Sequence, residues 1–293
     1  MKKKSRNRAL RVAFLAACLC STMPSRAQTP PMGGVTELAV EHDEDQMMMT
    51  WLCVALNDYA NAMANWLLDA SQESGGVLSR QALARFQTQL RRATFAYFEY
   101  SYEIEGTRYS RIYLAASGRS FSTYVDPRAT GLTPPARADA EYFLADDVVR
   151  HATAGPSENS DVTAQPNRPS MPNRNNDAEI KALQSIMRDI DAGIVVPGGR
   201  LLGFVSKQPC DSCSAALRQF ALETRSDVHI NYVHGANEDG LRTPVWMALR
   251  QAREAIIADL ATMFTAPVSA APAFVDRPPD DEDTSSSVCS RPS

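Results

Sequence analysis

Two cysteines that follow a proline carry the clearest chemical signal in the chain. Cys210 and Cys213 stand at the junction between a predicted strand, residues 201–205, and a predicted helix, residues 212–222. Two thiolates at a helix N-terminus can share one Zn²⁺, and the positive end of the helix dipole favours their ionised form. The pair therefore predicts half of a zinc site.

An upstream pair of carboxylates, Asp177 and Glu179, can complete such a site. A catalytic zinc keeps one position open for water beside three protein ligands. Asp177 can supply the third ligand, and Glu179 then lies beside the metal-bound water as a proton shuttle. The same residues also fit an ordinary capping box, with Asn176 as the N-cap and Glu179 reaching back to it. The zinc site is the preferred interpretation because Pro-Cys-x-x-Cys follows at the next predicted helix.

A ligand-x-Glu motif followed by Pro-Cys-x-x-Cys resembles the signature of the zinc deaminases of bases and nucleotides. Over roughly residues 93–264 the chain is similar to the cytidine/adenosine deaminase superfamily, and within it to the deaminase-like domains of bacterial secreted toxins and effectors. The cysteine motif matches fully, whereas Asp177 replaces the usual His or Cys. The resemblance implies that the metal ligands come from the starts of two successive helices. It also implies that Ser206 and Gln208 contact the substrate.

The periodicity of apolar residues predicts the elements that position these groups. A helical pattern runs from about residue 35 to residue 68, and Ser79 begins a second helix; the two are expected to form a helical hairpin. Alternation then predicts a strand over residues 96–104, a turn at Glu105-Gly106 and a second strand over residues 112–116. Residues 124–176 are expected to be an irregular insertion with a short helix near residues 138–149. The remaining predictions are a helix from Asp177, the strand and helix around the cysteines, a strand over 228–233 and a helix from Pro244.

These elements predict an α/β fold with three layers, in which a mixed sheet of about four to five strands is covered by helices. The expected organisation is an export signal (1–27), a helical hairpin (28–92), a deaminase-like domain (93–264) that contains the insertion (124–176), and a disordered acidic tail (265–293). The order of strands and helices is also that of the deaminase fold.

The first 27 residues have the pattern of an export signal, with a basic start, an apolar run and the cleavage site Ser25-Arg26-Ala27. The apolar run is too short to span a membrane, so no transmembrane segment is expected in the mature chain. The protein is therefore expected in the periplasm or outside the cell, with lipidation at Cys18 as a minor alternative. In an oxidising compartment Cys53 and Cys289 can form a disulfide.

The net charge of the chain limits the kind of nucleic acid that it can bind. Removal of residues 1–27 takes away seven basic and no acidic residues, which moves the formal net charge from -4 to about -11. A strongly acidic chain argues against a broad surface for duplex nucleic acid. A local basic patch at Arg85, Arg91 and Arg92 still suits a nucleotide or a short single strand.

The sequence therefore predicts an exported zinc-dependent hydrolytic deaminase that acts on a nucleobase in a nucleotide, a nucleoside or a nucleic acid. A toxin or effector, with an immunity protein as its partner, is one form of this function. Two alternatives stay open. A periplasmic thiol–disulfide protein would also place Cys210 and Cys213 after a strand and at a helix start. A non-catalytic secreted binding protein could use the same scaffold, with the helical hairpin as its interaction surface.

Overall fold

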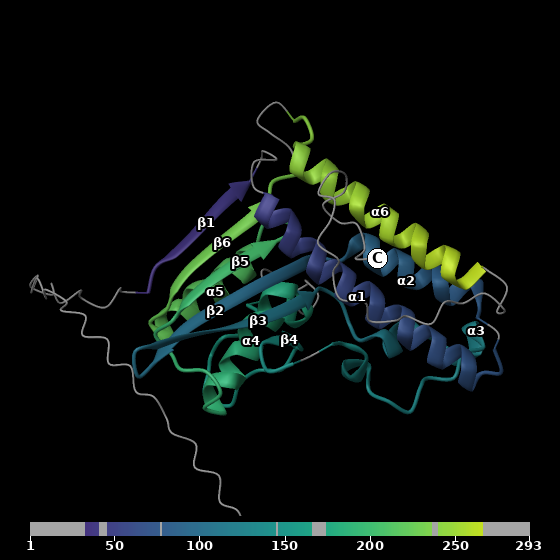
Figure 1. Cartoon of the computed structure of the whole chain (residues 1–293), viewed down its shortest axis with the longest axis horizontal. Helices are drawn as coiled ribbons and strands as arrows, with labels where there is room; N and C mark the ends of the chain where they lie inside the picture. The colour runs from purple at the N-terminus through teal and green to yellow at the C-terminus, as the bar shows by residue number, and fades with distance from the viewer. Residues whose placement is uncertain are drawn as a thin grey trace, which may run out of the picture. The chain divides into compact units, whose positions relative to one another are not determined.

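The aromatic strand predicted near residues 96–104 lies inside a six-stranded mixed sheet (Figure 1). The computed structural model describes residues 33–40, 46–76, 78–144, 146–165, 174–235 and 240–265. The strands are β1 (Val35–Val40), β2 (Phe95–Ile104), β3 (Thr107–Ala116), β4 (Val149–His151), β5 (Arg200–Val205) and β6 (Asp227–Val233). The α-helices are α1 (Gln46–Glu73), α2 (Arg80–Arg92), α3 (Pro127–Thr130), α4 (Ala178–Asp191), α5 (Asp211–Thr224) and α6 (Pro244–Thr265). Short 3-10 segments are η1 (Phe121–Tyr124), η2 (Asp139–Tyr142) and η3 (Arg174–Asn176).

The strand order across the sheet is β1-β6-β5-β2-β3-β4. β2 pairs antiparallel with both of its neighbours, β3 and β5. The pairs β1 with β6, β5 with β6 and β3 with β4 are parallel. α4 leads into β5, and α5 follows directly after it. The starts of both helices therefore lie at the end of the sheet where β5 ends and β2 begins. The end of β5 is close to the start of β2, since the Ser206 amide donates to the Phe95 carbonyl oxygen at 2.8 Å.

Both faces of the sheet are covered by helices, which gives the expected three layers (Figure 1). α1, α2 and α6 contribute to one core with Phe95, Tyr97 and Phe204, whereas α4 and α5 contribute to the other with Phe98 and Tyr100. Alternate residues of β2 therefore point to opposite cores, as the period of a strand requires. Burying each of these large side chains stabilises the fold by about 1.5–3 kcal/mol.

Most of the predicted elements are present. The helical hairpin corresponds to α1 and α2, and Ser79 caps α2 by accepting a hydrogen bond from the Gln81 amide at 3.2 Å. The strand pair, the helix after Asp177, the helix after Cys210 and the helix from Pro244 are confirmed.

Three predictions differ from the structure. Residues Val35–Val40 were expected to begin a helix, but they form β1, because their apolar residues find a parallel partner in β6. β4 is a short strand inside the predicted insertion, and only η2 is helical where residues 138–149 were expected to form a helix. The sheet therefore has six strands among the described residues, and the expected count was four to five.

Several predictions fall outside the described residues, namely the signal at 1–27, Cys18, Cys289 and nearly all of the tail at 265–293. Cys53 is disulfide-bonded. In the segments that are described, every helix is too short or too polar to cross a bilayer.

A buried carboxylate holds α4 against the sheet. The Asp189 side chain is 7% exposed and lies 3.3 Å from the Arg111 Nε atom, whose side chain is 8% exposed. Asp189 also accepts a hydrogen bond from the Tyr113 hydroxyl at 2.8 Å and lies 3.5 Å from Arg150. Arg111 and Tyr113 belong to β3 and Arg150 belongs to β4, so one carboxylate joins three elements.

We expect Asp189→Ala to lower the free energy of unfolding by about 3–5 kcal/mol, because it leaves the Arg111 charge buried without a partner. Arg200→Ala is the control. It removes an exposed ion pair of 3.9 Å with Asp227 and should cost less than about 1 kcal/mol. Denaturant unfolding of both variants measures the difference, and equal losses would contradict the structural role of Asp189.

Candidate metal centre

The start of α5 is built around the first cysteine. Cys210 is the N-cap residue of this helix, with an extended backbone, and its sulfur accepts a hydrogen bond from the Cys213 amide at 3.4 Å. The Ser214 amide donates to the Cys210 carbonyl oxygen at 2.8 Å and closes the first turn. Both sulfur atoms therefore lie at the positive end of the helix dipole, which stabilises negative charge on them.

The start of α4 differs from the capping box that its sequence also allows. The N-cap is Asp177 and not Asn176, which belongs to η3, and the Asp177 side chain makes no capping hydrogen bond. Glu179 is the second residue of the helix and is 3% exposed. The carboxylate of Asp177 is consequently directed at the cysteines and not at the backbone of its own helix.

Asp177, Cys210 and Cys213 form one cluster, with their potential ligand atoms all within 4.8 Å of one another. The Asp177 Oδ2 atom lies 3.7 Å from the Cys210 sulfur and 3.6 Å from the Cys213 sulfur, and the two sulfurs are 3.2 Å apart. In a tetrahedral zinc site, ordinary bond lengths place an oxygen about 3.5 Å from a sulfur and two sulfurs about 3.8 Å apart. The two oxygen–sulfur distances match this geometry, and the sulfurs need to separate slightly.

The burial of the three groups also suits a metal that keeps one open position. Cys213 is 1% exposed, while Cys210 and Asp177 are half-buried, the Asp177 side chain being 22% exposed. Within the described residues this is the cluster of His, Cys, Asp and Glu side chains that can hold a metal ion. The two thiolates are soft donors that favour zinc over magnesium or calcium, and the carboxylate is a harder ligand that zinc also accepts.

Two cations border the triad. The Arg174 guanidinium lies 3.4 Å from the Asp177 carboxylate, and Asp177 raises the pKa of Arg174. Lys181 is buried and donates from Nζ to the carbonyl oxygens of Ala116 and Gly118, at 2.8 and 2.6 Å. Burial lowers the pKa of Lys181 to about 8. These cations offset part of the negative charge that three anionic ligands would concentrate, and Lys181 fixes the start of α4 to the end of β3.

Glu179 lies beside the triad without belonging to it. Burial raises the pKa of its carboxyl to about 7, and the neighbouring Asp177 charge acts in the same direction. A hydrogen bond with the Cys213 side chain and the charge of Lys207 act in the opposite direction. The side chain is thus a buried carboxyl in contact with one of the candidate ligands.

The two residues suggested as substrate contacts have different environments. The Ser206 hydroxyl is 3% exposed and accepts a hydrogen bond from the Phe95 amide at 2.8 Å, so it holds the end of β5 to the start of β2. Gln208 is exposed. Lys207, which the sequence interpretation passed over, lies between them and donates to the Arg92 carbonyl oxygen at 2.7 Å. Arg174 and Lys181 were also missed; their spacing of three and four residues from Asp177 was the available signal.

The two cysteines of the motif are present as free thiols. Both thiols are free, and their 3.2 Å separation is longer than a disulfide bond. Burial raises the pKa of Cys213, and the nearby Glu179 carboxyl raises it further. In a Cys-x-x-Cys redox pair it is the first thiol that normally has a lowered pKa, so the raised pKa of the second leaves disulfide exchange open.

No family model, curated protein or solved structure matches this chain.

We expect the purified wild-type protein to bind about one zinc ion per chain and Asp177→Ala to bind clearly less, because one of three ligands is lost. Asp177→His should retain zinc, since imidazole is a good zinc ligand and its neutral form reduces the charge of the site. Metal analysis after dialysis against a weak chelator measures this. Asp147→Ala, which removes an exposed carboxylate elsewhere, is the control. Equal zinc content in wild type and Asp177→Ala would show that Asp177 is only a helix N-cap.

Proposed function

We propose that the protein is a zinc-dependent hydrolytic deaminase of a nucleobase, and that Asp177, Cys210 and Cys213 hold the metal. The observation that carries the proposal is the convergence of this carboxylate on two thiols at the starts of two helices. A structural zinc usually has four protein ligands, whereas three leave a position for water. The ligand-x-Glu and Pro-Cys-x-x-Cys motifs add the resemblance to the deaminase superfamily.

The reaction that fits is hydrolysis of an amidine. Water adds to the ring carbon that carries the exocyclic amino group of cytosine or adenine, the carbon–nitrogen bond then breaks, and ammonia leaves while a carbonyl forms. Zinc in this site would supply a nucleophilic hydroxide near neutral pH. Of the two protons of the attacking water, the protein must deliver one to the ring nitrogen and the other to the departing amino group.

Glu179 is the group that we assign to this proton transfer. It contacts Cys213, one of the proposed ligands, and it is buried where bulk water does not compete. A carboxylate there can accept a proton and deliver it to nitrogen. Asp177 cannot transfer the proton while it is a metal ligand. The two carboxylates therefore have different roles, Asp177 as ligand and Glu179 as proton carrier.

The proposed compartment is outside the cytoplasm, on the basis of the export pattern in residues 1–27. A toxin or effector with an immunity protein as partner fits an exported enzyme of this kind. The rival function is thiol–disulfide exchange by Cys210 and Cys213, and the observation in its favour is their close approach as free thiols.

We expect Glu179→Gln to keep zinc and fold but to lower the rate of deamination by about 10²–10⁴-fold, because the amide keeps the shape and cannot accept the proton. Ammonia release from cytosine- and adenine-containing substrates measures the rate. Glu103→Gln, at an exposed position of β2, should leave the rate unchanged. Full activity in Glu179→Gln, or loss of its zinc, would refute the assignment.

Thiol labelling separates the proposal from its rival. In the zinc-loaded protein, both cysteines should resist alkylating reagents until a chelator is added, because the metal occupies the sulfur lone pairs. A redox pair would instead react readily when reduced, and at least one thiol would titrate below the usual value of about 8.5. Rapid labelling of reduced, zinc-free protein with no effect of chelator would favour disulfide exchange.

A further inference from the structure

A basic hollow lies next to the segment that leads into the cysteine motif. Its volume is about 390 Å³, and it is bounded by the end of α2, the residues after β5 and one side of α6. Its lining includes five cationic side chains: Arg91, Lys207, Arg242, Arg250 and Arg253. Lys207 is three residues before Cys210 in the chain, so this hollow adjoins the proposed metal centre.

Among the described residues, most of these cations have no ion-pair partner. The single carboxylate in the lining, Glu254, lies 3.2 Å from Arg91, and both side chains are 47% exposed. For Lys207, Arg242, Arg250 and Arg253, the described residues include no ion pair. In a chain whose overall charge is negative, this is a local excess of cations that an anionic ligand would relieve.

Backbone carbonyl groups hold three of the cations in place. Lys207 donates to the Arg92 carbonyl at 2.7 Å, Arg253 donates to the Arg91 carbonyl at 2.8 Å, and Arg242 donates to the Gly235 carbonyl at 3.2 Å. Carbonyl acceptors orient these side chains without cancelling their charge. The Nε atom of Arg253 is buried and has no hydrogen-bond partner among the described residues. Three of the cations that line the hollow are therefore held in fixed positions.

An aromatic ring lies among these cations. Trp246 is half-buried, and the guanidinium carbons of Arg242 and Arg250 lie 4.4 and 5.5 Å from its ring centroid. Arg242 and Arg250 stand four residues before and four residues after Trp246 in the chain. Cations that track phosphates together with an aromatic side chain that stacks a base are the usual components of a single-strand binding groove.

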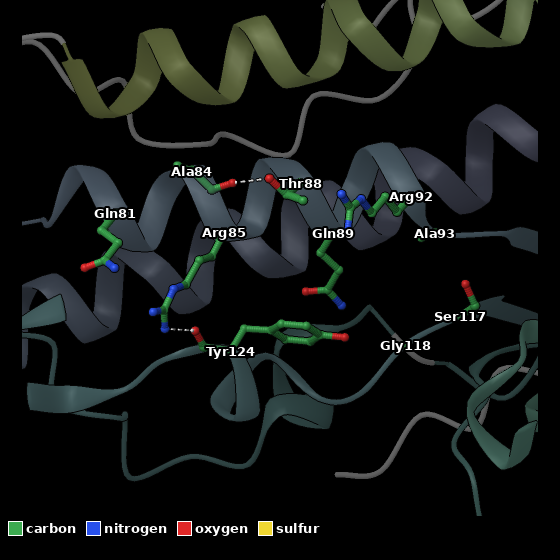
Figure 2. Close-up of a pocket in the computed structure, with 10 residues that line it drawn as sticks. All are labelled: Gln81, Ala84, Arg85, Thr88, Gln89, Arg92, Ala93, Ser117, Gly118 and Tyr124. Carbon is green, nitrogen blue, oxygen red and sulfur yellow. Dashed lines mark hydrogen bonds between the residues drawn. The ribbon is translucent and has the colours of Figure 1, made fainter. Parts of the chain in front are cut away.

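A second hollow lies along α2, whose Arg91 lines the first hollow and whose Arg92 lines the second. Its volume is about 520 Å³ and its lining contains Arg85 and Arg92 but no acidic residue. Figure 2 shows Arg85 and Gln89 extending from α2 towards Tyr124 across this hollow. Gly118, also in the lining, donates its amide to the carbonyl of Asn176, the residue before Asp177. The two hollows thus adjoin the segments that hold the two halves of the proposed metal site.

We propose that the two hollows bind the phosphates and a flanking base of a single-stranded nucleic acid whose target base enters the proposed metal centre. This inference rests on the proposed function and specifies its substrate class. A free nucleotide carries its phosphates at one point, whereas Arg85 and Arg92 alone are seven residues apart on α2, a distance of about 10 Å along the helix. Stacking on Trp246 requires an unpaired base, which excludes an intact duplex at this position.

The test is fluorescence anisotropy with the full-length Glu179→Gln protein, so that binding is measured without turnover. The probes are a labelled oligodeoxynucleotide and an oligoribonucleotide of mixed sequence, each titrated over a range of salt concentrations. The double variant Arg242→Gln/Arg250→Gln is compared with Arg108→Gln/Arg218→Gln, which removes the same charge from exposed positions outside both hollows. Thermal unfolding confirms that both double variants are folded.

We expect Arg242→Gln/Arg250→Gln to weaken binding at low salt by more than tenfold and to reduce the slope of log affinity against log salt by about 1.4, since each lost phosphate contact accounts for about 0.7. Trp246→Ala should weaken binding by about tenfold, and the control should stay within twofold of the parent. Tighter binding of one of the two probes would identify the preferred strand as DNA or as RNA.

Failure of the inference differs from failure of the proposed function. Strand binding that is absent, that is equal in the two double variants, or that a free nucleotide displaces at the same nucleotide concentration would overturn the inference. Strand binding that depends on Arg242 and Arg250, but with no ammonia released by wild type from any strand, would retain the binding site and reject the deaminase.

Discussion

The approach of the Asp177 carboxylate to the sulfurs of Cys210 and Cys213 is the interaction on which the account of this molecule depends. Three groups that become anionic when they bind metal are brought together at 3.2–3.7 Å in a partly buried place. Without a cation, such a cluster is stable only if protons stay on the thiols, and burial does raise the pKa of Cys213. With a cation, the same desolvation strengthens the attraction between metal and ligands. The arrangement of these three groups therefore favours a bound metal ion over a free pair of thiols.

The order of the strands in the sheet allows Asp177 to approach the two cysteines. β2 lies between β3 and β5, and Phe95 at its start is joined to Ser206 at the end of β5. α4 and α5, which cover one face of the sheet, therefore begin at the same end of it. Two buried side chains then set the position of α4: Lys181 joins its first turn to the end of β3, and Asp189 joins its last turn to Arg111. Misplacing α4 by one turn would move Asp177 by about 5.4 Å and separate it from both thiols.

The sequence predicts the local elements well because their periodicity reports burial directly. Alternation in Ala96 to Ile104, the turn at Glu105-Gly106 and the cysteine motif at a strand-to-helix junction all correspond to the structure. Features that depend on distant partners were not predictable in the same way. Val35–Val40 is a strand because β6 pairs with it, although the two segments are far apart in the chain. The role of Asp177 as N-cap in place of Asn176 depends on η3. The basic hollow joins Arg91 to Arg253 across 162 residues, and no local pattern indicates that contact.

The most direct measurement of the central claim is X-ray absorption at the zinc edge of the protein purified under reducing conditions with its native metal. The account predicts about one zinc per chain with two sulfur neighbours at about 2.3 Å and two lighter neighbours at about 2.0–2.1 Å, one from Asp177 and one from water. In Asp177→His the same two sulfur neighbours should remain, while the outer-shell scattering of an imidazole ring appears. A protein that contains no zinc, or a zinc surrounded only by oxygen and nitrogen, would contradict the account.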